Sequence, residues 1–560
     1  MSQLFRKKSV DQIISDAEKN PNSLQKTLGV TDLVSLGIAA IVGAGIFSTI
    51  GLAAFNGGPA ISLLFVFVAF ACVFTALSYA QFASTVPVSG SAYTYAYVAF
   101  GELFAWIIGW ALILEYAVSN MVVAISWSQY FVSMCEGFGI HIPKWLTMAP
   151  SYATEAYQKS LEVGVDKLSG IEKMGLEAYQ TAPSIGGFPI IFDLPAGVIT
   201  FLVTVLVYIG IKESKRASNI MVMIKIGIIL AVIIGGAFFV KPENWVPFAP
   251  NGLGGVMGGV AAVFFAFIGF DSISTTAEEC KNPQRDLPRA MIACLVICAA
   301  LYVAITLVLT GMVNYKDLNV KDPLAYVFEH IGFDYMAGII SVTSVVAITS
   351  ALLVFQLAQP RIWMTMSRDG LLSKKFAKIH PKYKTPSYAT IVTGFVVAIP
   401  ALFMKMDFFV DLTSVGTFFA FIVVCGGVLY MDKTGLSAKS KFKVPYINGK
   451  YLVGFGFVVG LILSFTYGHE SLQEWKNLGA DVLVHKSLVI FFWIVWFVLS
   501  ILSYKHNFSV LPVIGMLINL YLMTELGASN WIIFVIWLII GLIIYFVYGK
   551  KHSKLNKANA

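Results

Sequence analysis

Charged side chains are scarce in this sequence. Asp, Glu, Lys and Arg make up 12% of its 560 residues, whereas soluble domains carry about 25%. Hydrophobic residues make up 58%, and apolar runs of about twenty residues, long enough to cross a bilayer as a helix, recur from residue 33 to residue 549. This composition excludes soluble multidomain, disordered, collagen-like and nucleic-acid-binding proteins. It predicts an all-α polytopic membrane protein.

Cysteine is rare and catalytic motifs are missing. The six cysteines form no CxxC pair and no cluster with histidine, so we expect neither a metal site nor a disulfide framework. No HExxH, GxSxG, P-loop or GxGxxG motif stands in a suitable context, which argues against an enzyme, and we expect no cofactor. The polar first 32 residues lead into no short apolar region with a cleavage site, so the first apolar run is predicted to remain as a helix.

The apolar runs predict about fourteen membrane spans. Their approximate bounds are 33–56, 60–84, 99–135, 194–211, 218–240, 252–278, 289–313, 335–359, 387–404, 407–431, 450–468, 486–504, 510–526 and 529–549. The third is overlong, so it must tilt or begin as an interfacial helix. With the N-terminus inside, 28 of the 39 Lys and Arg residues lie in inner segments and 10 in outer ones, which predicts cytoplasmic N- and C-termini under the positive-inside rule.

These spans divide the chain into four parts. Residues 1–32 are predicted to form a cytoplasmic segment, 33–431 a ten-helix transport core, 432–549 four additional helices, and 550–560 a cytoplasmic tail. One long polar insertion, 137–190, follows the third span and is predicted to lie outside; its stretch TEAYQKSLEVGVDKL is typical of a short amphipathic helix. We interpret the insertion as a solvated cap over the extracellular mouth, because a receptor-like domain would need a larger core.

Glycines interrupt two of the spans near mid-membrane. Gly43-Ala44-Gly45 lies in the first span, and Gly269, in FFAFIGFDSIST, lies in the sixth. Glycine weakens a helix by about 1 kcal/mol relative to alanine, and breaks five spans apart are typical of an inverted repeat of five plus five helices, in which they face each other. Free N–H groups there suit a carboxylate and free carbonyls an ammonium, so such a site would bind a zwitterionic amino acid. Close helix packing is the alternative use of these glycines.

Several longer stretches, in order and spacing, resemble the cationic amino acid transporter family of the amino acid–polyamine–organocation superfamily. They are LGVTDLVSLGIAAIVGAGIF (28–47), LSYAQFASTVPVSGSAYTYAY (77–97), LILEYAV (112–118), FFAFIGFDSISTTAEECKNPQRDLPRA (264–290), QPRIWMTMSRDGLL (359–372) and WLIIGLIIYFVYGKKHS (537–553). The insertion at 137–190 is longer than we expect for bacterial-type members. The resemblance implies the LeuT-type fold, a 5+5 inverted repeat with four extra C-terminal helices, and secondary amino-acid transport.

The resemblance also implies which backbone groups hold the substrate. The N–H groups of Ala44 and Gly45 would receive its carboxylate. The carbonyls of Ile41, Phe265 and Ile268 would take its amino group. Because these are backbone contacts, specificity for the substrate side chain would come from elsewhere in the pocket.

Four side chains near the two breaks are further candidates. Phe267 and Phe270 are expected to form a wall or gate, with simple helix packing as the alternative. By resemblance, Glu115 in the third span lies near the pocket and would read a substrate side chain or tune occlusion; a buried, protonated structural glutamate bonded to a neighbouring helix is the alternative. Asp271 would gate the inner path or cap the second half-helix.

Lys225 is the one basic residue that lies away from the ends of a predicted span. Ionisable side chains within membranes are functional candidates, and Lys225 lies nine residues beyond Arg216, about 13 Å along a helix. By resemblance, proton-coupled relatives place a lysine ammonium at this position. We expect protonated Lys225 to join span one to span eight and to stabilise the substrate-competent state, with proton loss favouring release. Alternatively, the alkyl chain of Lys225 would carry the ammonium back to the cytoplasmic surface of the membrane.

These features predict a secondary active transporter that imports amino acids across the cytoplasmic membrane by alternating access and proton symport. Its expected partners are an amino acid, protons and the lipid bilayer. An amino-acid exchanger or facilitator is the alternative within transport, and a non-transporting amino-acid sensor is the alternative outside it. The sequence leaves cationic and small neutral substrates open. With no organelle address evident, we expect a bacterial-type inner membrane.

Overall fold

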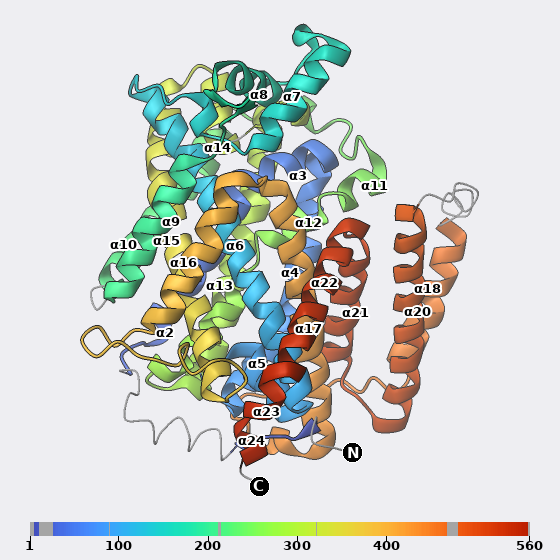
Figure 1. The fold of residues 1–560 in the computed structure, drawn as a ribbon. Helices are drawn as coiled ribbons and strands as arrows, with labels where there is room; N and C mark the ends of the chain where they lie inside the picture. Colours follow the sequence, from blue (N-terminus) through green and yellow to red (C-terminus); the bar gives the residue numbers. More distant parts are fainter. Residues whose placement is uncertain are drawn as a thin grey trace.

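A computed structural model describes residues 5–10, 26–88, 90–210, 214–320, 322–467 and 480–557. Parts of the predicted N-terminal segment and tail, Lys212 and residues 468–479 lie outside the described residues. Within the described part, long apolar helices form a bundle (Figure 1). Nine helices there are long and apolar enough to cross a membrane, and five shorter apolar helices accompany them. The prediction of an all-α polytopic membrane protein is confirmed.

The first half of the core begins with an interrupted helix. It consists of α2 (Val30–Ile41), the π-helical turn η2 (Gly45–Thr49) and α3 (Ile50–Gly57). The helices that follow are α4 (Ile61–Thr85), α5 (Ser91–Ala99), α6 (Glu102–Gly137), α9 (Leu194–Ile209) and α10 (Ser214–Ala237). The predicted third span, 99–135, corresponds to α6 alone, and the short α5 precedes it. At 36 residues, α6 still extends about 54 Å, farther than the hydrocarbon core is thick.

The second half of the core begins in the same way. Its interrupted helix consists of α11 (Gly252–Met257), α12 (Val260–Phe265) and the 3₁₀ segment η7 (Phe270–Glu279). The helices that follow are α13 (Pro283–Met312), α14 (Pro323–His330), α15 (Asp334–Arg368), α16 (Ser387–Phe403) and α17 (Met406–Thr434). The polar stretch after the sixth span is therefore helical from Pro283, where a proline fits because the first helical N–H needs no partner within the helix.

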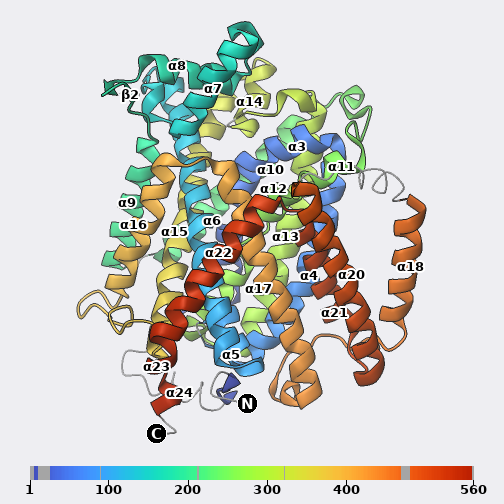
Figure 2. The same ribbon diagram turned by 45° about the vertical axis from the view of Figure 1, so that its right-hand side comes forward.

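Four further long helices lie C-terminal to the core. They are α18 (Leu452–Tyr467), α20 (Ala480–His506), α21 (Val510–Thr524) and α22 (Ala528–Ile544), and the chain continues from α22 through η11 (Tyr545–Gly549) into α23 (Lys550–His552) and α24 (Lys554–Lys557). In both ribbon views α18 and α20 stand at the edge of the bundle (Figures 1 and 2). By contrast, α22 is tied to α6, because Trp110 Nε1 donates to the Trp537 carbonyl (2.8 Å) and Trp537 Nε1 to the Trp110 carbonyl (2.9 Å).

The insertion at 137–190 forms a small cap of two helices and a hairpin. These are α7 (Pro150–Val163), α8 (Gly170–Thr181) and the antiparallel strands β1 (Ser184–Ile185) and β2 (Phe188–Pro189). The helix predicted in this stretch corresponds to α7. Ser169 and Glu172 form a reciprocal capping box at the start of α8, which satisfies free N–H groups there. The cap covers the end of the bundle opposite to both chain ends (Figure 2).

Candidate functional site

The first predicted break is present at the end of α2. The helix stops at Ile41, and the chain turns through Val42 and Gly43. The Gly43 N–H donates to the Ile41 carbonyl (2.9 Å), while the N–H groups of Ile46 and Phe47 both donate to the Gly43 carbonyl (3.2 Å each). The regular helical ladder is therefore lost for about one turn and resumes in η2.

The second break lies between α12 and η7, at Gly269. Its φ of 115° belongs to a region that residues with a Cβ rarely adopt. A Cβ on Gly269 would lie 2.9 Å from the Cβ of Ala40, and a Cβ on Gly45 would lie 2.3 Å from the Cα of Ala266. The two interrupted segments therefore lie directly against each other, and glycine is what allows this approach.

The backbone groups predicted to hold a substrate are brought together at this crossing. The residues that carry them are all buried: Ile41, Gly43, Ala44, Gly45, Phe265 and Ile268. The Ile41 carbonyl accepts a bond from the Tyr302 hydroxyl (2.9 Å), and the Phe265 carbonyl accepts one from the Ile268 N–H (3.2 Å). Because a carbonyl oxygen has two lone pairs, each retains the capacity to accept a bond from an ammonium.

Phe267 and Phe270 lie in aromatic clusters beside the second break. The Phe267 ring is 5.3 Å from that of Tyr302, and the Phe270 ring is 5.9 Å from that of Tyr79 and 5.1 Å from that of Phe421. Both phenylalanines are fully buried. The arrangement corresponds to the packing alternative, and a gating role would require either ring to leave its cluster.

Lys225 of α10 reaches the first break. Its Nζ donates to the carbonyls of Ala39 (2.8 Å) and Val42 (2.5 Å), and the residue is 0% exposed. The side chain therefore does not extend to the cytoplasm. In the part of the chain that the structure describes, Lys225 makes no hydrogen bond to α15, the predicted span eight, where the hydroxyls of Thr349 and Ser350 donate to carbonyls of their own helix. The ammonium thus bridges to span one alone.

Two buried carboxylates lie on α6 and at the start of η7. The Tyr116 hydroxyl donates to Asp271 Oδ2 (2.8 Å), so Asp271 is bound to α6 immediately beside Glu115. Within the described ranges, Glu115 Oε2 and Asp271 Oδ1 are buried without a hydrogen-bond partner. Burying a charged carboxylate oxygen without a hydrogen-bond donor is costly.

Ion pairs that sequence reasoning missed close the end of the bundle that holds the termini. Arg361 Nη2 lies 2.6 Å from Glu279 Oε1, and Lys8 Nζ lies 2.5 Å from Asp369 Oδ1. The Tyr93 hydroxyl donates to the other oxygen of Asp369 (2.6 Å). For the Arg361–Glu279 pair, the available signal was the opposite charge of two distant motifs, EECK and QPRIWMTMSRD. Among the described residues, no group of three or more His, Cys, Asp or Glu is placed to hold a metal ion.

Comparison with known proteins identifies the family to which this helical bundle belongs. A family model described as amino acid permease matches residues 28–499, and one for the C-terminus of that permease matches residues 509–553. The chain belongs to the amino acid permease family. The superfamily that the motifs resemble is thereby confirmed, and with it the fold class.

Curated relatives match this permease over its whole length. It is 38% identical to the methylthioribose transporter of Bacillus subtilis (strain 168), with 100% of both chains covered. It is also 38% identical to the branched-chain amino acid permease BcaP of the same organism, with 99% of both chains covered. The vacuolar cationic amino acid transporter 4 of Arabidopsis thaliana is 32% identical to the permease over 100% of this chain and 97% of its own. The relatives are thus membrane transporters whose substrates differ.

Proposed function

We propose that this permease imports amino acids by alternating access and that Lys225 couples their uptake to protons. The observation that carries the proposal is the contact of the Lys225 ammonium with the Ala39 and Val42 carbonyls. These carbonyls flank the point where α2 ends, so the charge state of one side chain acts on the helix end that would hold the substrate.

The proposed coupling follows from the strength of charged hydrogen bonds. A protonated amine binds carbonyls more strongly than a neutral amine does, so protonated Lys225 would hold α10 against the end of α2. Loss of the proton would weaken both bonds and release α2, which would open the site toward the end of the bundle that carries the termini. We propose that this end faces the cytoplasm, in accord with the distribution of basic residues.

Amino acids are preferred as substrates because of the backbone groups at the crossing. N–H groups and carbonyls at helix ends suit a carboxylate and an ammonium. One of the two relatives at 38% identity is named for transport of methylthioribose. This sugar derivative has neither a carboxylate nor an ammonium. It is the second candidate substrate, and competition by methylthioribose against a panel of amino acids in uptake experiments separates the two.

The proposal is tested by uptake into proteoliposomes with an imposed pH gradient. We expect wild-type protein to accumulate its preferred amino acid when the outside is acidic. Lys225→Ala should lose this accumulation, whereas Lys241→Ala, an exposed lysine after α10, should retain it. Accumulation by Lys225→Ala in response to the gradient would exclude Lys225 as the coupling group.

The same liposomes distinguish symport from the alternatives. An exchanger would take up labelled amino acid only when unlabelled amino acid is present inside, and its uptake would ignore pH. A sensor would bind amino acid without any flux. We expect the wild-type protein to show net uptake into empty liposomes that depends on the pH gradient.

A further inference from the structure

A cavity of about 430 Å³ lies between the cap and the helix bundle. Ser48 of η2 and Gln129 of α6 line it on the bundle side, residues of α7 and α8 line it on the cap side, and Lys405 and Asp407 line it where α16 leads into α17. Its volume falls within the range of about 300–1,000 Å³ that is usual for small-molecule sites. The central site described above does not use this cavity.

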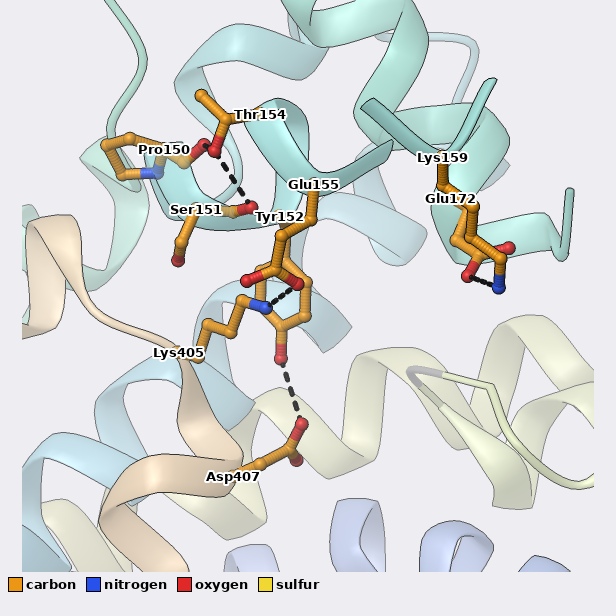
Figure 3. A network of polar contacts seen from close by, with 9 residues as sticks. All are labelled: Pro150, Ser151, Tyr152, Thr154, Glu155, Lys159, Glu172, Lys405 and Asp407. Carbon is orange, nitrogen blue, oxygen red and sulfur yellow. Dashed lines mark hydrogen bonds and ion pairs between the residues drawn. The ribbon is translucent and has the colours of Figure 1, made fainter. Parts of the chain in front are cut away.

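Charged groups of both signs surround the cavity, with carboxylates in excess. Its lining contains three carboxylates, of Glu155, Glu172 and Asp407, and two ammonium groups, of Lys159 and Lys405. Lys159 pairs with Glu172 at 2.5 Å, and Lys405 pairs with Glu155, as Figure 3 shows. One carboxylate is therefore left over.

The remaining carboxylate belongs to Asp407. Its Oδ2 accepts a bond from the Tyr152 hydroxyl at 3.4 Å, and among the described residues no ammonium lies within ion-pair distance of it. Lys405 instead lies over the Tyr152 ring, with its Nζ 4.8 Å from the ring centroid, and turns toward Glu155 (Figure 3). The cavity thus presents an ammonium and an unneutralised carboxylate on either side of one phenol.

The geometry points to an outer binding site for a cationic amino acid in this cavity. The lining carries one net negative charge, because it has three carboxylates and two ammonium groups. A cationic amino acid carries one net positive charge, from two positive groups and one carboxylate, and would neutralise it. Its side-chain cation would lie at Asp407 and its carboxylate at Lys405. The inference rests on the proposed function, because it concerns an amino acid on its way to the central site.

Two features make binding there compatible with onward passage. Ser48 lies three residues beyond Gly45, so a ligand leaving the cavity meets the first break next. The Glu155 side chain is 64% exposed, and ion pairs in contact with water contribute only about 0–1 kcal/mol. A ligand carboxylate can therefore replace Glu155 at Lys405 at little cost.

The inference is tested by thiol protection in nanodiscs. All six native cysteines are buried, so an Asn319→Cys variant supplies a reactive thiol in the cavity lining. We expect free lysine, and not leucine, to slow the reaction of this thiol with a cationic methanethiosulfonate reagent, which forms a mixed disulfide and releases methanesulfinate. Adding Asp407→Asn should raise the lysine concentration needed for protection by up to about five-fold, as expected for the loss of one ion pair in contact with water.

The control is Glu162→Gln, which removes an exposed carboxylate of α7 outside the cavity and should leave the protection by lysine unchanged. Equal protection with and without Asp407→Asn, or equal protection by leucine, overturns the inference. The readout requires no transport, so absence of flux in liposomes would overturn the proposed function and leave this result standing. If Asp407→Asn does not fold, Lys405→Gln, which removes the partner of the ligand carboxylate, is used in its place with the same expectation.

Discussion

At the scale of single residues, two glycines and one lysine determine what the crossing can do. Gly45 faces the Cα of Ala266 and Gly269 faces Ala40, so each glycine allows one interrupted segment to lie on the other. Lys225 then bonds to the carbonyls that the first interruption leaves available. The three residues come from two halves of the core and meet only in the folded protein.

Gly45→Ala is expected to disable the central site. Its methyl group would lie 2.3 Å from the Ala266 Cα, and because the obstacle is backbone, the two segments must separate. We expect at least about a ten-fold loss in substrate affinity, which corresponds to about 1.4 kcal/mol, in equilibrium binding to protein in nanodiscs. Gly227→Ala is the matched control, since a Cβ at Gly227 meets nothing within 4 Å. Unchanged affinity in Gly45→Ala would contradict the placement of the site.

Some of these residues could be predicted from the sequence and others could not. Glycines at mid-span and a lone lysine are conspicuous because most side chains around them are large and apolar. Tyr302 and Tyr116, which bond to Ile41 and Asp271, are two of 24 tyrosines. Their roles depend on long-range packing, which no local pattern reveals.

At the scale of elements, the cap is held together by polar contacts over a very small core. In the described part of the cap, the buried apolar residues form two small clusters. The Lys159–Glu172 pair joins α7 to α8, and Glu172 also completes the capping box with Ser169. The hydrogen bond from Lys159 is the main cause that lowers the pKa of Glu172, with Ser169 acting in the same direction and partial burial acting against them.

Stability of the cap should therefore depend on pH through Glu172. A carboxyl group whose pKa is lowered by folding stabilises the folded state above its unfolded value of about 4.3, and this contribution is lost as the pH falls through the folded pKa. We expect Glu172→Gln to unfold at a lower temperature than wild type at pH 7, and we expect this difference to shrink as the pH falls below the unfolded value of about 4.3, as measured by circular dichroism in detergent. Glu177→Gln, on the exposed face of α8, should show no such pH dependence; a Glu172→Gln difference that does not shrink with falling pH would exclude the charge as its cause.

Helix boundaries were predictable where apolar runs are long and uniform. The predicted spans 60–84 and 387–404 correspond closely to α4 and α16. The predicted third span, 99–135, likewise corresponds to α6. The short α5 before it was not predicted, because hydropathy alone does not show the change of chain direction at Gly101, whose φ is 95°. The start of α13 was missed because its first turns are polar and contain prolines.

At the scale of the whole molecule, the two ends of the bundle are closed by different means. A cap built from one insertion covers one end, while ion pairs between distant segments close the other. Of these, Lys8 and Tyr93 both bond to Asp369, where α15 ends. In the alternating-access cycle that we propose, these two closures would open in turn.

Asp369→Asn should favour opening at the end that carries the termini. It removes the partner of Lys8, and hydrogen bonds to charged groups contribute about 1.5–3 kcal/mol. Cys294 of α13 packs closely against α2, because its Sγ lies 2.8 Å from the position that a Cβ on Gly37 would take. Movement of α2 away from α13 would expose this thiol, so its rate of alkylation reports the opening. We expect alkylation of Cys294 to become at least about ten-fold faster, as 1.4 kcal/mol implies. Asp334→Asn, at the other end of α15, should leave the rate unchanged. An equal increase in both variants would contradict a role of Asp369 in closing this end of the bundle.

Proton movement during uptake tests the central claim most directly. Proteoliposomes loaded with a pH-sensitive dye receive amino acid outside, with no pH gradient at the start. The account predicts that the interior acidifies as wild-type protein takes up its substrate, and that Lys225→Ala gives no acidification while still exchanging labelled for unlabelled amino acid. Acidification by Lys225→Ala at the wild-type rate would contradict it.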